Sequence, residues 1–262
     1  MPSSTVLSRI APQPASYWQV ARAHRYSLLF ALPLLLLYEG LAALLSDSHG
    51  AGMRNGADVI ISSAFYAVGG RYGSALFGLV VIGGSIWLIG RDLRLQRVGG
   101  GGGGGALRGR VFAGMFAESL VLALAFGTVV GLVTAQLLGL APFAAGVQGI
   151  ASQGPVTKLM LSLGAGLYEE LLFRVVLVSG LAWGARTLLG WRPVAAGVAA
   201  TLVAAVIFSA FHYIGAYGDP FRIDSFVYRA VGGVFFSALY LLRGFGITAW
   251  THALYDVFVL VV

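Results

Sequence analysis

The sequence predicts an all-α, polytopic integral membrane protein, a helical bundle with about seven transmembrane helices. Hydrophobic residues make up 58% of its 262 residues and charged residues only 10%, whereas an ordinary soluble domain carries about 25% charged residues. Apolar runs long enough for transmembrane helices recur along the chain, with arginines between them. Such a chain cannot cover itself with polar surface, and its length suits a single membrane domain over residues 1–262.

The charge pattern favours a lipid bilayer as the partner and argues against nucleic acid. The formal net charge is +7, but the arginines lie between apolar runs and so mark loops on the cytoplasmic side of a membrane. The absence of cysteine excludes disulfides, thiolate metal sites and a cysteine nucleophile. Abundant Gly and Ala with a single lysine, Lys158, suggest a bacterial chain. We therefore expect it in the bacterial inner (cytoplasmic) membrane.

The first part of the chain, residues 1–110, predicts N-terminal helices followed by a cytoplasmic loop rich in Gly and Arg. Residues 27–45 form an apolar run without a small-residue cleavage site, which predicts a retained first helix and not a removed signal peptide. Residues 57–69 are too few to cross the bilayer and predict a re-entrant or interfacial segment, whereas residues 72–90 are long enough. The seven glycines 99–105 and the flanking arginines predict a flexible cytoplasmic tether.

The second part, residues 111–262, predicts five further spans and contains most of the ionisable residues that lie inside apolar runs. With seven spans, an amino terminus in the cytoplasm puts the carboxyl terminus outside. Arg186, Arg192 and Arg243 then all fall on the cytoplasmic side, as expected. The predicted spans are residues 111–140, 159–181, 194–213, 225–242 and 247–262.

Ionisable residues lie inside these apolar runs. A charge at the centre of a bilayer costs at least a few kcal/mol, so intramembrane ionisable residues are candidates for a functional site. Two glutamates, Glu39 and Glu118, match no motif and are expected to make polar contacts between helices. The remaining ionisable residues within or at the ends of predicted spans are Glu169, Glu170, Arg174, His212, Arg229, His252 and Asp256.

Three short patterns hold most of these residues. In the first, Glu170 and Arg174 are four residues apart and can pair on one helix face, while Glu169 points roughly 100° away and stays outside that pair. In the second, His212 follows Phe208 by four residues, and in the third Asp256 follows His252 by four. A desolvated carboxylate suits general-base work on water, and histidine can orient that water or stabilise an oxyanion. The set is that of a water-using hydrolase.

Each pattern also has a structural reading. Glu169, Glu170 and Arg174 can form an ion-pair network that stitches the bundle together. His212 near a span end can be an interfacial histidine bonded to the backbone, and His252 with Asp256 can be a local helix-stabilising pair. The chain would then be a non-enzymatic membrane protein, such as an immunity factor or a transporter.

Taken in order, the three patterns resemble a known family. Glu169-Glu170 with Arg174 matches EExxxR, Phe208 with His212 matches FxxxH, and His252 with Asp256 matches HxxxN/D. These are the signatures of the CPBP family of intramembrane endopeptidases, which includes the CaaX prenyl protease and the Abi, or bacteriocin-processing, proteins. The resemblance covers residues 159–262.

The resemblance implies a glutamic intramembrane protease and a role for each residue. Glu169 with His212 would activate the attacking water, Glu170 and Arg174 would buttress the site, and His252 and Asp256 would hold the oxyanion. Many members have asparagine where this chain has Asp256. Since a carboxyl group donates a hydrogen bond only when protonated, orienting His252 is an alternative role for Asp256.

Cofactor and substrate follow from the same resemblance. The family has also been called metalloprotease, and His212, His252, Glu169 and Asp256 could form a zinc site. The chain has no HExxH motif, and a glutamate-activated water without a cofactor is favoured. The expected substrate is a membrane-anchored peptide or protein. Nothing in the chain selects a prenylated CaaX substrate, and no pattern predicts the oligomeric state.

Overall fold

A computed structural model of the chain describes residues 16–49, 52–98, 107–139, 150, 152–215 and 217–261. All regular elements in this part of the chain are helical, which confirms the predicted all-α class. Six of its helical stretches are long and apolar enough to cross a membrane, which agrees with a polytopic integral membrane protein. The predicted glycine tether at residues 99–105 lies outside the described residues.

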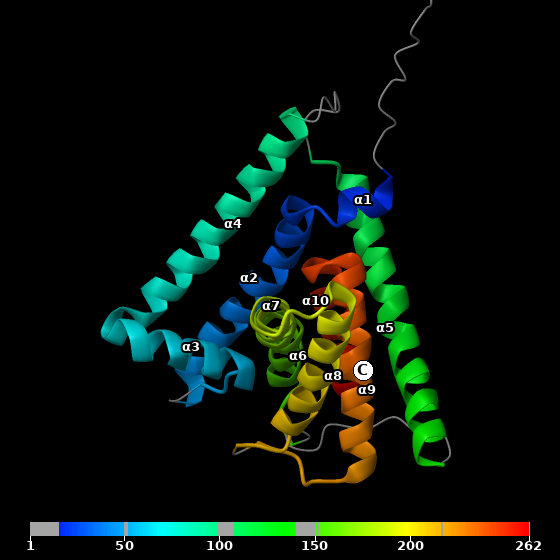
Figure 1. Cartoon of the computed structure of the whole chain (residues 1–262). Helices are drawn as coiled ribbons and strands as arrows, with labels where there is room; N and C mark the ends of the chain where they lie inside the picture. The colour runs from blue at the N-terminus through cyan, green and yellow to red at the C-terminus, as the bar shows by residue number, and fades with distance from the viewer. Residues whose placement is uncertain are drawn as a thin grey trace, which may run out of the picture.

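The N-terminal helices follow the predicted spans within a few residues. The short segment expected at residues 57–69 is the helix α3, which a single 3-10 turn, η1, connects to the long helix α4. In Figure 1, α3 and α4 splay away from the other helices as an arm. The bounds are α1 (Tyr17–Ala21), α2 (His24–His49), α3 (Gly56–Gly69), η1 (Gly70–Tyr72), α4 (Gly73–Val98) and α5 (Gly109–Leu138).

The C-terminal helices include one long stretch, from 155 to 188, that departs from regular α-helix in its middle. Two π-helical segments, η2 and η3, flank Glu170 there, and single π turns of this kind occur frequently at functional sites. The bounds are α6 (Pro155–Gly164), η2 (Ala165–Glu169), η3 (Leu171–Val178), α7 (Ser179–Leu188), α8 (Pro193–Phe211), α9 (Ile223–Arg243) and α10 (Phe245–Leu260).

The last helix, α10, accounts for the difference between the seven expected spans and the six observed. Its 16 residues extend about 24 Å, less than the roughly 30 Å of a bilayer core. Its buried residues include Ile247, Ala249 and Ala253, and it packs against α2, α5, α6, η2 and α9. Because protein and not lipid surrounds α10, its length need not match the bilayer.

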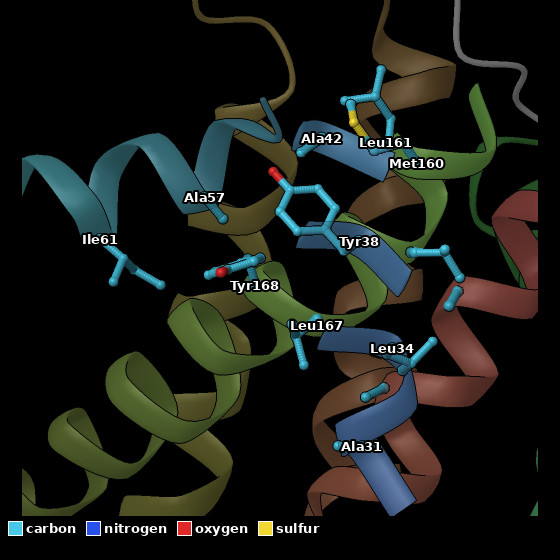
Figure 2. Packing of buried hydrophobic residues seen from close by; sticks show 13 residues of the cluster. Ala31, Leu34, Tyr38, Ala42, Ala57, Ile61, Met160, Leu161, Leu167 and Tyr168 are labelled. Carbon is cyan, nitrogen blue, oxygen red and sulfur yellow. The ribbon is translucent and has the colours of Figure 1, made fainter. Parts of the chain in front are cut away.

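Two apolar clusters share α10. In the first, Tyr38 of α2 and Tyr168 of η2 lie with ring centroids 5.2 Å apart, against Leu34 and Leu167 (Figure 2). In the second, Phe126 of α5 stacks on Phe236 of α9 at 4.6 Å. In α4, by contrast, no large apolar side chain whose burial is described is buried, as expected for a helix in contact with lipid. Those that are exposed are Leu79, Val80, Ile82, Ile86, Trp87 and Leu95.

Glycines allow close packing only where helices meet. A Cβ at Gly166 would overlap the carbonyl oxygen of Ala249, so η2 can approach α10 this closely only with glycine. Gly164, Gly232 and Gly233 also face neighbouring side chains, whereas a Cβ at Gly83 or Gly84 in α4 would meet nothing within 4 Å.

Glu39 and Glu118 make the interhelical contacts expected of them. Glu118 of α5 pairs with Arg243 at 2.5 Å and accepts a hydrogen bond from the Tyr17 hydroxyl at 2.7 Å. Glu39 of α2 pairs with Arg54 at 2.9 Å and accepts a hydrogen bond from the Tyr168 hydroxyl at 2.7 Å. Each carboxylate therefore ties together segments far apart in the sequence.

Candidate active site

The adjacent carboxylates of Glu169 and Glu170 reach different partners, because neighbouring residues on a helix point in different directions. Glu170 is fully buried and its Oε1 lies 3.1 Å from Arg174 Nη1, which is the pair expected from the four-residue spacing. Glu169 is also buried but lies apart from that pair, on a wall of a cavity. The two residues thus have separate surroundings.

Arg174 lies in an aromatic cage. Its guanidinium group is 4.4 Å from the ring centroid of Phe208 and 5.4 Å from that of Phe236. Such contacts stabilise a desolvated cation, and the Glu170 carboxylate adds the opposite charge. Phe208, the first residue of the FxxxH motif, therefore supports the arginine of the first motif.

His252 bonds to Glu170 as well as facing Asp256. Its Nδ1 donates to Glu170 Oε1 at 2.7 Å, and its ring stacks on Phe236 with centroids 4.4 Å apart. Its Nε2 lies 3.7 Å from Asp256 Oδ2, too far for a direct hydrogen bond. The contact with Glu170 joins the first and third motifs, a link that spacing within one helix could not reveal.

Glu169 has one oxygen held and one oxygen open. Its Oε1 accepts a hydrogen bond from the Asn55 amide at 2.9 Å. Its Oε2 has no hydrogen-bond partner among the described residues and lies 3.9 Å from His212 Nε2. That separation exceeds a direct hydrogen bond and leaves space for a bridging group.

His212 is the C-cap of α8, and the backbone of the preceding turn orients its ring. Its Nδ1 is 2.9 Å from the carbonyl oxygen of Phe208. Since a carbonyl can only accept, Nδ1 carries the hydrogen, and Nε2 of the neutral ring has a free lone pair. That nitrogen is the one directed at Glu169. His212 therefore makes the backbone hydrogen bond expected of an interfacial histidine, and it also directs Nε2 at Glu169.

These groups meet at a cavity of about 680 Å³. Glu169, His212 and Asp256 line it together with Asn55. His252 does not line the cavity itself, but it lies next to Asp256, which does line it. Much of the remaining wall is apolar and includes Ile60, Leu161, Phe211 and Leu260.

Asn55 is a polar lining residue that the sequence reasoning missed. It caps α3, since its side-chain oxygen accepts a hydrogen bond from the backbone of Ala57 at 2.9 Å. An asparagine just before an apolar helix is a recognisable N-cap signal. Its second role is to donate a hydrogen bond to Glu169, which lies 114 residues further along the chain. No local sequence pattern indicates a contact of that kind.

A polar network holds Asn55 from behind. The Tyr38 hydroxyl accepts from the Asn55 backbone N–H at 3.1 Å and donates to Asp58 at 2.8 Å. Arg54 bonds to Asp58 at 3.0 Å and pairs with Glu39. Burial disfavours the charge of Arg54, but the carboxylates of Glu39 and Asp58 outweigh burial and raise the pKa of Arg54. Arg54 therefore stays protonated, and the network holds the segment that bears Asn55 in place.

A family comparison covers the part of the chain that holds the three motifs. Residues 151–258 match a family model described as type II CAAX prenyl endopeptidase Rce1-like. This is an Rce1-like segment. The resemblance to intramembrane endopeptidases that the motifs predicted is thereby confirmed for this segment, and the match supports protease activity. No curated protein and no solved structure matches the chain.

The Rce1-like segment supplies most of the site but not all of it. It includes every residue of the EExxxR, FxxxH and HxxxN/D patterns. Asn55 and the network behind it precede the segment. The N-terminal helices therefore complete a site whose motifs all lie in the Rce1-like segment.

The four side chains proposed from the sequence as zinc ligands do not converge on one point. In the part of the chain that the structure describes, no group of three or more His, Asp or Glu side chains is arranged to hold a metal ion. Glu169 and His212 face each other, while His252 directs Nδ1 at Glu170. The donor set in this arrangement does not fit a zinc site.

Proposed function

We propose that the protein is an intramembrane endopeptidase that hydrolyses a peptide bond in a membrane-associated peptide or protein with a water activated by Glu169. The observation that carries the proposal is the pairing of Glu169 Oε2 and His212 Nε2 across 3.9 Å at the wall of a cavity. Both atoms can accept a hydrogen bond, and a single water between them has a partner for each of its two protons.

The proposed reaction begins with the proton of that water. Glu169 Oε2 takes it as the water oxygen attacks the scissile carbonyl carbon, while His212 Nε2 orients the water through its second proton. The tetrahedral intermediate then collapses, the C–N bond breaks, and Glu169 returns the proton to the leaving amine. Asn55 keeps Glu169 in place by holding Oε1.

In the proposed reaction Asp256 stabilises the oxyanion. His252 lies next to Asp256, on the side away from the cavity. His252 uses Nδ1–H for Glu170, so its neutral Nε2 can only accept. Asp256 Oδ2 lies 3.7 Å from that nitrogen, and as a protonated carboxyl group Asp256 can donate its hydrogen bond to the oxyanion. Glu170 and Arg174 would hold this arrangement without touching the substrate.

The proposed substrate is a membrane-anchored peptide or protein in the bacterial inner membrane, with the amino terminus of the enzyme in the cytoplasm. The apolar walls of the cavity suit an apolar peptide segment. A prenyl group, named by the matched family, is not part of the proposal, because no feature of the chain selects it.

No cofactor takes part in the proposed reaction. Purified protein is expected to contain far less than one equivalent of zinc, and phenanthroline should leave cleavage unchanged. Metal analysis of the protein before and after chelation checks this. Stoichiometric zinc whose removal abolishes cleavage would contradict water activation by Glu169 alone.

The proposal is tested by comparing peptide termini in membranes of cells that express the wild type or Glu169→Gln. The control variant is Asp224→Asn, the same change from carboxylate to amide at a site paired only with Arg222 and Ser225. A set of new termini should be present with the wild type and the control and absent with Glu169→Gln at equal protein level. Identical termini in all three would contradict the proposal and favour the immunity factor or transporter.

A further inference from the structure

Arginines gather at one end of the bundle, which we term the arginine end. Arg22 donates to the carbonyl of Leu241 at 3.2 Å, and Arg243 donates to that of Trp18 at 3.2 Å. These bonds bring the end of α9 next to α1 and the start of α2. The arginines placed here by these contacts and by their neighbours in sequence are Arg22, Arg25, Arg91, Arg94, Arg108, Arg110 and Arg243.

Two further contacts bring α4 and α5 to the same end. The backbone N–H of Arg25 donates to Asp92 of α4 at 3.2 Å, and that of Arg108, just before α5, donates to the Tyr26 hydroxyl at 3.0 Å. The arginine end is therefore where α2 and α5 begin and where α4 and α9 end. Figure 1 shows the starts of α2 and α5 and the end of α4 in the upper part of the view.

The cavity opens at the opposite end. Its walls come from the segment after α2, the segment after α8 and the last turns of α10, and α2 and α10 both begin at the arginine end. A Cβ at Gly56 would lie 2.9 Å from the Phe211 ring, so the start of α3 contacts the end of α8. The mouth is thus one helix length away from the arginine end.

The cations near the mouth are fewer than the seven arginines of the arginine end. Those at the mouth are Arg54, Lys158, Arg222 and Arg229. Loops rich in Lys and Arg stay in the cytoplasm, so the arginine end is the cytoplasmic one.

We infer that the cavity opens to the extracytoplasmic side of the membrane and that its substrates are apolar peptide segments that reach it from that side. The substrate part of this inference rests on the proposed endopeptidase function, whereas the orientation does not. Peptide tails confined to the cytoplasm would be excluded as substrates, because the catalytic groups lie one helix length from the arginine end.

The cysteine-free sequence makes the orientation directly measurable. Single cysteines are placed at Tyr217, an exposed residue at the mouth, and at Leu107, an exposed residue at the arginine end. Spheroplasts that express each variant are treated with a membrane-impermeant maleimide before and after disruption. The wild type, which has no thiol, measures background labelling.

Tyr217→Cys should be labelled in intact spheroplasts, and Leu107→Cys should rise from background only after disruption. The reverse pattern, labelling of both in intact spheroplasts, or labelling of neither would each overturn the orientation. Termini that depend on Glu169 should also map to extracytoplasmic segments, and a cytoplasmic location would overturn the substrate class. If labelling is as expected but no termini depend on Glu169, the proposed function fails while the orientation stands.

Discussion

At the scale of single residues, the site depends on a division of work between adjacent carboxylates. Glu170 has Arg174 and His252 within hydrogen-bonding or ion-pairing distance, so its charge is neutralised inside the bundle. Glu169 keeps one oxygen directed at His212. Glu170 Oε2 also has no hydrogen-bond partner among the described residues, but Glu170 is fully buried and does not line the cavity. Only Glu169 has an open oxygen at the cavity wall, where it can take a proton from water, which is why the proposed base is Glu169 and not its neighbour.

Asn55→Ser should lower both the cleavage rate and the stability of the protein. Serine keeps the N-cap of α3 but is too short to donate to Glu169 as Asn55 does. A hydrogen bond to a charged group contributes about 1.5–3 kcal/mol to stability, and the same energy lost from the transition state corresponds to a loss of roughly tenfold or more in rate. The measurement is kcat together with the thermal midpoint. Unchanged kcat would remove Asn55 from the mechanism.

Asp256→Asn should retain activity, and Asp256→Ala should lose about 10²-fold, the usual cost of removing one oxyanion donor. Asparagine donates a hydrogen bond without needing a proton from solvent, whereas alanine cannot donate. Cleavage rates of the two variants are compared at equal expression and across pH. If Asp256→Asn is as inactive as Asp256→Ala, the carboxylate charge matters, and orienting His252 replaces the oxyanion role.

At the scale of helices, the sequence predicted the elements well because apolar run length is a local property. Residues 225–242 were expected and α9 spans Ile223–Arg243; the short run at 57–69 became α3. The π turns around Glu170 had no signal, because their residues also suit an α-helix. The Glu169–Asn55 and Glu170–His252 contacts could not be predicted either, since they join separate helices and depend on how those helices pack.

Gly166→Ala should destabilise the protein, whereas Gly83→Ala should not. A Cβ at Gly166 overlaps the backbone of α10, while a Cβ at Gly83 meets open space. Overpacking typically costs about 1–3 kcal/mol, and alanine is the better helix former by about 1 kcal/mol where space allows. Thermal midpoints of the two variants in the same detergent check this. Equal midpoints would contradict the close packing of η2 on α10.

At the scale of the whole molecule, the two halves of the chain build the site jointly. The Rce1-like segment bears the three motifs, and the N-terminal helices hold Asn55 through Tyr38, Asp58 and Arg54. The three motifs were sufficient to predict the family resemblance from the sequence. The contribution of the first half was not predictable, because Glu39 and Asp58 match no motif and acquire their role only in the folded bundle.

The most direct test of the account compares Glu169→Gln with Glu170→Gln, using a synthetic peptide that spans a cleavage site found in the membrane comparison. Glu169→Gln should abolish cleavage. Its thermal midpoint should stay close to that of the wild type, because removing the Glu169 charge breaks no ion pair within hydrogen-bonding distance. Glu170→Gln should lower the midpoint, since it leaves the buried Arg174 without its counter-charge. Full cleavage by folded Glu169→Gln would contradict water activation by Glu169, and equal loss of folded protein in both variants would contradict the division of roles between the two glutamates.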